Sequence, residues 1–276
     1  DTLVCGAIYN APDEVMQSKV EMSDAVKSTI EKALAETPVS DEHAALLAEV
    51  QAQWDAYKAA GRTDLFDSKE WYALQTWING DKVGSLDLVK VLCYQSYAGY
   101  EWIEQLGMQF KDAVSQGAGS LWQRTHTSKM NMGTGFISVY ADQIEQYSDK
   151  ITLINEATAT ELVKDGDKVT AVKATDNHTG KEFTVTAKDG VVLATGGFSA
   201  NPKMVQEYNT TGKWPDLSKI ATTNRESSSQ GDGITMAKNV GASLTDMDEL
   251  QLLYLGNVKD GQLTKYPPRC VNGTDQ

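Results

Sequence analysis

The chain has 276 residues, with 25 lysines and arginines against 38 aspartates and glutamates, which gives a formal net charge of −13. Apolar residues make up 41% of it and charged residues 23%, a composition that indicates a globular protein and excludes a disordered or fibrous one. The acidic excess argues against a nucleic-acid partner, which requires a basic surface. No apolar run approaches the roughly 20 residues of a membrane-spanning helix.

Cysteine and histidine usage predicts no local metal site. The three cysteines are odd in number and scattered, so we expect each to be a small buried apolar side chain: Cys5, Cys93 and Cys270. The three histidines lie far apart, without the spacing of a zinc motif: His43, His126 and His178.

The N-terminal part of the chain predicts a strand followed by helices. Residues up to about 10 have the pattern of a strand, and residues 12–120 are mainly helical. A first helix is indicated by apolar residues at helical spacing: Val15, Met22, Val26, Ile30 and Leu34.

Two serines predict the starts of two further helices. Ser40 can cap a helix with one face formed by His43, Leu47, Val50, Trp54 and Tyr57. Ser85 can cap another, which ends at Gly107 and carries Leu88, Leu92, Trp102 and Leu106.

From residue 150 to 200 the pattern changes to that of strands. Short strands at 151–154, 169–172 and 183–185 are separated by turn residues, which predicts a three-stranded antiparallel meander. A further strand follows at Val191–Leu193, where consecutive apolar residues predict burial on both faces. Helices are then expected around Pro202–Tyr208 and from Gly231 to Gly241.

Two glycine motifs could serve a ligand. The predicted buried strand ends at Ala194-Thr195-Gly196-Gly197, where glycines without Cβ atoms permit close approach of a ligand or of another backbone. In Gly231-Asp232-Gly233, a carboxylate at a helix start can accept hydrogen bonds from ligand hydroxyls. A tight turn and a simple helix cap are the structural alternatives for the two motifs.

An Arg–His pair lies among glycines, at Arg124 and His126. It could bind a carboxylate or the edge of a cofactor. On this motif alone, a solvated loop is the simpler interpretation.

Taken in order, these motifs resemble the FAD-dependent fumarate reductase and succinate dehydrogenase flavoproteins, most closely the soluble flavocytochrome c and urocanate reductase branch. The likeness is weak over residues 13–116. The matching stretches are Asp1–Ala7, Arg124–His126, Gly133–Gly135, Ala159–Val169, Val191–Phe198, Thr223–Asn224 and Gly231–Ala242.

The resemblance implies a fold and a set of cofactor contacts. The fold would be α/β: an incomplete Rossmann-like FAD-binding domain with a helical segment and a three-stranded antiparallel meander, and with the capping domain beginning near 251–276. The implied FAD contacts are Gly6, Ala7, Ala159, Ala194, Thr195, Gly196, Gly197 and Asp232. The candidates for residues near the substrate are Arg124, His126, Leu253 and Tyr254.

The chain departs from the family pattern in two respects. The family's Gly-x-Gly-x-x-Gly motif and its proton-donating arginine are expected outside residues 1–276, so we expect an internal fragment that is inactive alone and binds FAD weakly or not at all. In addition, Leu253 stands where the family has a substrate-binding histidine, while Arg269 and Asn272 align with its proton relay. A substrate other than fumarate is therefore implied, with another activated double bond.

The expected function is that of part of a flavin-dependent oxidoreductase that reduces or forms an activated C=C bond, with a small-molecule substrate and an electron donor as partners. A ketosteroid-dehydrogenase-like flavoenzyme and a non-catalytic α+β binding module are the alternatives. Because a fragment would expose strand edges and apolar surface, self-association to a homo-oligomer is also expected. The family includes cytoplasmic and extracytoplasmic members, and the sequence favours neither location.

Overall fold

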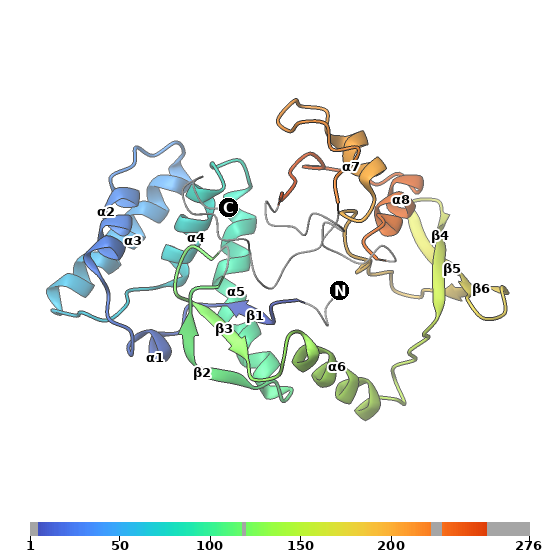
Figure 1. The fold of residues 1–276 in the computed structure, drawn as a ribbon, viewed down its shortest axis with the longest axis horizontal. Coiled ribbons are helices and arrows are strands. Elements are labelled where there is room, and N and C mark those ends of the chain that lie inside the picture. Colours follow the sequence, from blue (N-terminus) through green and yellow to red (C-terminus); the bar gives the residue numbers. More distant parts are fainter. Residues whose placement is uncertain (1–4, 118–119, 222–227, 253–276) are drawn as a thin grey trace, which may run out of the picture. The chain divides into compact units, whose positions relative to one another are not determined.

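A computed structural model describes residues 5–117, 120–221 and 228–252 (Figure 1). The chain forms two compact units, an N-terminal unit of residues 2–151 and a C-terminal unit of residues 152–276. The described residues contain helices and two three-stranded sheets, so the predicted mixed α/β class is confirmed. No helix among these residues is long and apolar enough to cross a bilayer.

Five helices form most of the N-terminal unit: α1 (Glu14–Gln17), α2 (Asp24–Leu34), α3 (Asp41–Ala59), α4 (Lys69–Asn79) and α5 (Leu86–Gln105). A serine hydroxyl caps each of α2 to α5 by accepting a hydrogen bond from the backbone N–H three residues later. The predicted caps Ser40 and Ser85 are confirmed. Ser23 and Ser68 perform the same role for α2 and α4.

The single helix predicted over 15–34 is wrong, because the chain breaks between α1 and α2. Ser18 ends α1 and Ser23 begins α2. Between them, the Met22 amide donates to the Thr63 carbonyl at 2.9 Å. This contact with a distant loop replaces the helical hydrogen bonds that a continuous helix would need.

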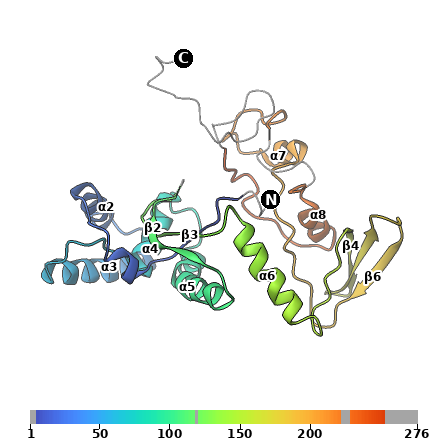
Figure 2. The ribbon, with the colours of Figure 1, turned by 60° about the horizontal axis from the view of Figure 1, so that its bottom comes forward.

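A hydrophobic core lies among α2, α3, α4 and α5, and Figure 2 shows α2 and α3 side by side. The predicted α3 face is confirmed, since all five of its named residues are buried. Aromatic rings fill much of this core: Trp54 stacks on Tyr57 at 5.0 Å between centroids, and Trp71 meets Trp122 edge-on at 5.2 Å.

The boundaries predicted for α5 are confirmed, but most of the apolar residues named for it do not face the core. Leu88, Leu92 and Trp102 are exposed, while Cys93, Tyr100 and Ile103 point into the core. The helix has two apolar stripes, and the one that faces the core lies about a third of a turn away from that of Leu88, Leu92 and Trp102.

A small antiparallel sheet completes the N-terminal unit, in the order β1 (Ile8–Asn10), β3 (Thr125–Ser128), β2 (Phe110–Ser115). His126 of the central strand lies opposite both Tyr9 and Val114. A second hydrophobic cluster joins this sheet to α5 and to α6 (Thr134–Gln146).

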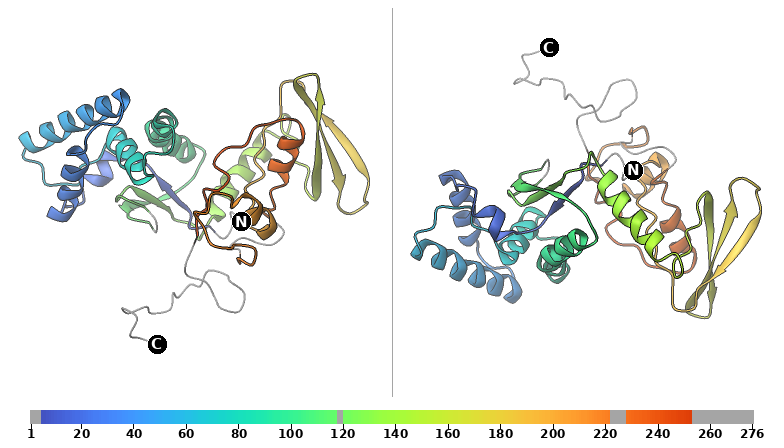
Figure 3. Two further views of the ribbon diagram at one scale, coloured as in Figure 1. Left: turned by 90° about the horizontal axis from the view of Figure 1, so that it is seen from above. Right: turned by 90° about the horizontal axis from the view of Figure 1, so that it is seen from below.

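The C-terminal unit begins with the predicted meander: β4 (Ala157–Asp165), β5 (Lys168–Asp176) and β6 (Glu182–Thr186), which Figure 3 shows side by side. Its turns fall at the predicted positions, with Gly166 and Gly180 at positive φ. The first strand starts at Ala157, so the prediction of a strand at 151–154 is wrong. Those four residues are irregular and exposed.

The strand predicted at Val191–Leu193 is also wrong. The segment is irregular, and Val192 is 92% exposed. Consecutive apolar residues become a buried strand only beside other strands, and none of the described strands pairs with this segment. The two predicted helices that follow are confirmed as α7 (Pro202–Tyr208) and α8 (Asp232–Asn239).

Two buried histidines predict that stability depends on pH. Burial lowers the pKa of both His43 and His126. Below about pH 6.5 the unfolded chain takes up protons that the folded chain does not, so the free energy of unfolding falls as the pH decreases from 7.5 to about 5.5.

Urea unfolding at a series of pH values measures this dependence. The slope of the unfolding free energy against pH gives the number of protons bound on unfolding. In the double variant His43→Gln/His126→Gln, this number should be smaller by about one for each histidine between these pH values. An equal slope in the parent chain and the variant would contradict the account.

Candidate functional site

Arg124, the residue directly before β3, belongs to a buried charge network in the N-terminal unit. Its Nε and one terminal nitrogen donate to the two carboxylate oxygens of Asp67, each at 2.9 Å, and both side chains are buried. The guanidinium lies over the ring of Tyr72 at 4.1 Å. Asp67 also accepts hydrogen bonds from the Gln17 side chain at 2.5 Å and from the Ser68 amide at 2.9 Å.

The interpretation of Arg124 and His126 as part of a solvated loop is therefore wrong, because both side chains are buried: Arg124 directly precedes β3 and His126 lies on it. The Arg124 charge is matched bidentately by Asp67, an arrangement that ties β3 to α1 and to the start of α4. Contact of Arg124 with a substrate stays a prediction.

His126 lies two residues after Arg124, on β3, and packs against aromatic rings. Its ring centroid is 4.1 Å from that of Tyr100, and its Nε2 lies 3.3 Å from the Ala11 carbonyl oxygen and 3.9 Å from an Asp13 carboxylate oxygen. Its Nδ1 is buried with no partner among the described residues. Since burial lowers the pKa of His126, the ring is neutral in the folded protein at pH 7.

Gly6 and Ala7 border an open hollow of about 460 Å³ in the same unit. The opposite wall is formed by residues 127–132, which continue directly from β3. Ala7 and Met132 both have positive φ, at 52° and 51°, a conformation that costs free energy for a residue with a side chain and is frequent at ligand sites. Lys111 and Lys129 also line the hollow, and neither forms an ion pair with the described residues. The hollow therefore suits a ligand with an anionic edge.

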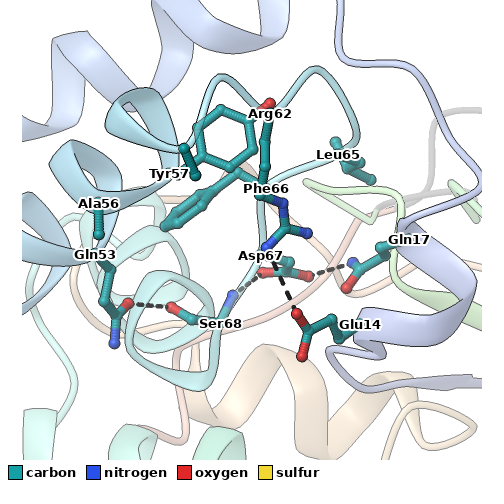
Figure 4. A pocket seen from close by; sticks show the side chains of 11 residues that line it. Glu14, Gln17, Gln53, Ala56, Tyr57, Arg62, Leu65, Phe66, Asp67 and Ser68 are labelled. Atoms are coloured by element: carbon teal, nitrogen blue, oxygen red, sulfur yellow. Dashed lines mark hydrogen bonds and ion pairs between the residues drawn. The ribbon is translucent and has the colours of Figure 1, made fainter.

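A second hollow, of about 370 Å³, lies between α1, α3 and the segment 62–68 (Figure 4). Its polar groups are already paired with one another: Ser68 with Gln53 at 2.7 Å, Arg62 with Glu14 at 3.5 Å, and Gln17 with Asp67. It holds none of the residues that the sequence predicts for a site, and its hydrogen bonds serve the buried charge network.

In the C-terminal unit, the predicted glycine doublet lies directly beside the start of α8. The Gly231 amide donates to the Gly197 carbonyl at 3.0 Å, and the Ala200 amide donates to the Ser229 carbonyl at 3.0 Å. Residues Ala194 to Gly197 are exposed, and Gly196 has a φ of +75°. The doublet is thus an accessible turn rather than a buried strand end.

Different constraints favour the two glycines around Asp232. A Cβ at position 233 would overlap the Thr195 hydroxyl, whereas one at position 231 would overlap only the flexible end of the Met204 side chain. Gly231 also has a φ of +85°. The Gly-Asp-Gly motif therefore lets the segment 195–201 lie against α8.

Asp232 and Ala159 complete the predicted set in this unit. Asp232 is exposed at the first position of α8, and its carboxylate makes no hydrogen bond to the residues that the structure describes. Ala159 is half-buried on β4, opposite Ala174. Lys164 of β4 donates to the Val240 carbonyl at the end of α8, at 3.1 Å, so that helix and strand are in contact.

The other sequence predictions have different outcomes. Leu253 and Tyr254 lie outside the described residues, as does Cys270. Cys93 is buried as expected, and burial raises the pKa of its thiol to about 11, but Cys5 is exposed. Among the described residues, no three histidine, cysteine or acidic side chains cluster as a metal site would require.

Comparison with known proteins identifies the family. The FAD binding domain family matches residues 55–262. An NADH:acrylate oxidoreductase of Vibrio harveyi is 33% identical over 241 residues, covering 83% of this chain and 24% of the relative. A urocanate reductase of Eggerthella lenta is 31% identical over 72% of this chain and 34% of the relative.

Among solved structures, the open conformation of a flavocytochrome c3 fumarate reductase matches with a TM-score of 0.62 and 28% identity, over 76% of this chain and 35% of that one. The chain therefore belongs to the FAD binding domain family, and the predicted resemblance to the fumarate reductase flavoproteins is confirmed. It spans about a quarter to a third of the length of these relatives.

The described residues fit FAD, the cofactor of this family. In the C-terminal unit, an exposed glycine doublet permits backbone contact, and the neighbouring Asp232 carboxylate is available for ligand hydroxyls. In the N-terminal unit, Gly6 and Ala7 border a hollow of suitable polarity. The individual contacts stay predictions.

Loss of the buried charge partner should destabilise the N-terminal unit. In Arg124→Leu the Asp67 carboxylate stays buried without its cation, which costs about 3–5 kcal/mol. Urea unfolding measures the loss. The matched control is Lys19→Leu, which removes an exposed pair with Asp112 and should cost less than about 1 kcal/mol. Equal losses in the two variants would contradict the network's role.

A side chain at position 233 should disturb the C-terminal unit through Thr195. Gly233→Ala forces the Thr195 hydroxyl to move and should destabilise the unit by about 1–3 kcal/mol. Adding Thr195→Gly removes the clashing atoms and should restore part of the loss. A double variant that is no more stable than Gly233→Ala would show that the contact is not the cause.

Proposed function

We propose that the chain is part of an FAD-dependent oxidoreductase that reduces a C=C bond activated by a carboxylate. The observation that carries the proposal is the accessible turn at Gly196-Gly197 beside the start of α8, with the exposed Asp232 carboxylate at its rim. The match to the FAD binding domain family and the 33% identity to an acrylate oxidoreductase support it.

The residues of this chain bind and orient, since in a flavoenzyme the hydride transfer itself belongs to the cofactor. The main-chain amides of Gly196 and Gly197 and the Asp232 carboxylate would hold polar groups of FAD. Lys111 and Lys129 offer positive charge to an anionic group in the hollow beside Ala7. Reduction of the alkene adds a hydride to one carbon and a proton to the other; bound FAD would supply the hydride, with its two electrons drawn from an external donor.

A monocarboxylate is the favoured substrate class. Leu253 stands where the family has a histidine that binds a substrate carboxylate, so one of the two carboxylates of fumarate would lack that partner. Acrylate, the substrate in the name of one relative, has a single carboxylate. Leu253, Tyr254, Arg124 and His126 are the proposed residues near the substrate.

A substrate panel tests the function. The gene product that contains this chain is loaded with FAD, and oxidation of reduced methyl viologen is followed with acrylate, urocanate or fumarate. We expect kcat/KM for acrylate to exceed that for fumarate by at least about tenfold, because the second carboxylate of fumarate would lack a charged partner in the site. Preference for fumarate would contradict the substrate class. Oxidation of a steroid ring in place of alkene reduction would favour the ketosteroid dehydrogenase alternative.

Gly197→Ala separates a ligand contact from a folding requirement. A Cβ at this position would meet no atom within 4 Å, and the residue has no positive φ, so the fold should tolerate alanine. If the glycine serves FAD binding, the gene product that carries this substitution should bind FAD at least about tenfold more weakly with unchanged melting temperature.

The matched control for this experiment is Gly190→Ala, another exposed glycine with open space around its Cβ position. Flavin fluorescence titration measures the affinity in both variants. Equal affinity in Gly197→Ala and the control would remove the evidence for FAD contact at the doublet.

A further inference from the structure

The hollow beside Ala7 is cationic, although the chain as a whole is acidic. Among the described residues that line it, Lys111 and Lys129 carry charge and none is an aspartate or a glutamate. Neither lysine side chain forms an ion pair or a hydrogen bond with the residues that the structure describes. In a chain with a net charge of −13, two cations that share a hollow without a carboxylate indicate a place for an anionic ligand.

The small sheet turns both lysines toward this hollow. Phe110 of β2 lies opposite Ser128 of β3, and both are buried, at 5% and 3% exposure. Because successive residues of a strand point to opposite faces, Lys111 and Lys129 point to the other, exposed face. The pairing of the strands shifts between Phe110 and Val114, so Lys111 lies at a β-bulge, a feature that redirects side chains and is frequent next to active sites.

The other polar groups of the hollow suit a carboxylate. Thr127 contributes a hydroxyl and Asn131 a side-chain amide, and both groups can donate hydrogen bonds to a carboxylate oxygen. The Lys129 amide donates to the Gln109 carbonyl at 2.9 Å, so the backbone that carries this lysine is tied to the residue before β2. Ala7, one of the predicted FAD contacts, borders the same hollow.

We infer that Lys111 and Lys129 bind the carboxylate of the substrate, an inference that rests on the proposed function. Leu253 offers no charge at the position where the family has its histidine, so a substrate carboxylate needs a cation from elsewhere. Two ammonium groups can each donate a charge-assisted hydrogen bond to one carboxylate. The second carboxylate of a dicarboxylate would still lack a partner, which agrees with a monocarboxylate substrate.

The phosphates of FAD are the other source of an oxyanion for the two lysines. In dinucleotide-binding folds the pyrophosphate is held by main-chain amides at a helix N-terminus, which follows a glycine motif. That motif is expected outside residues 1–276, so the hollow is not needed for the phosphates. The substrate carboxylate is therefore the favoured ligand.

Binding of propionate tests the inference without turnover, because this saturated monocarboxylate has no C=C bond to reduce. The FAD-loaded gene product that contains this chain is titrated by calorimetry. In Lys111→Gln/Lys129→Gln the Kd of propionate should be at least about tenfold higher than in the parent, since charge-assisted hydrogen bonds are lost. The melting temperature should not change, because both lysines are exposed.

The matched control is Lys181→Gln/Lys188→Gln. It removes two exposed lysines of the C-terminal unit and changes the net charge by the same amount. This control should bind propionate and FAD like the parent.

Acrylamide separates the effect of charge from general damage to the site, because a neutral amide of similar size replaces the carboxylate of acrylate. The lysine variant should lose at least about tenfold in kcat/KM for acrylate, mainly through a higher KM. Its kcat/KM for acrylamide should stay within about twofold of the parent value.

Equal propionate affinity in the lysine variant and the parent, or a parent that does not bind propionate, would overturn the inference. A matching loss of FAD affinity in the lysine variant would assign the lysines to the cofactor phosphates and would also overturn it. Lysine-dependent binding of propionate without alkene reduction would support the carboxylate site and contradict the proposed function. Alkene reduction with the same preference for acrylate over acrylamide in parent and variant would do the reverse.

Discussion

The C-terminal unit depends on one close approach, that of the segment 195–201 to the start of α8. Thr195 lies where a Cβ of residue 233 would be, and Gly197 shares a hydrogen bond with Gly231. Because position 233 has no room for a Cβ and Gly231 has a φ of +85°, glycine at these two positions holds the exposed doublet at 196–197 next to the Asp232 carboxylate. A structural requirement thus produces the candidate cofactor contact.

The N-terminal unit has a comparable fixed point in the buried pair of Arg124 and Asp67. The Asp67 carboxylate accepts hydrogen bonds from Gln17 of α1, from Arg124 directly before β3 and from the adjacent Ser68 amide at the start of α4, so two distant segments are joined to α4 at one residue. The residues that follow Arg124 on β3 lead into the wall of the hollow beside Gly6 and Ala7. The charge network therefore stabilises the strand that positions this hollow.

Local signals in the sequence predicted much of this structure. Ser40 and Ser85 mark helix starts because their hydroxyls bond to an amide three residues away, and the turns of the meander depend on residues such as Gly166. Long-range choices were not predictable. The partner of Arg124 lies 57 residues away in the sequence. Periodicity could not show which of the two apolar stripes on α5 faces the core. No described strand pairs with Val191–Leu193, which is why this apolar run is not a strand. For the site, the sequence found the glycine motifs, but the hollow lined by residues 127–132 appears only in three dimensions.

Hydrogen–deuterium exchange of the gene product with and without FAD tests the central claim most directly, since it reports contact at individual backbone amides. Peptides that cover 194–198 and 231–234 should exchange more slowly when FAD is present, while the exposed turn at 177–180 should exchange at an unchanged rate. Protection elsewhere, with these two segments unaffected by saturating FAD, would contradict the assignment of the glycine doublet to the cofactor.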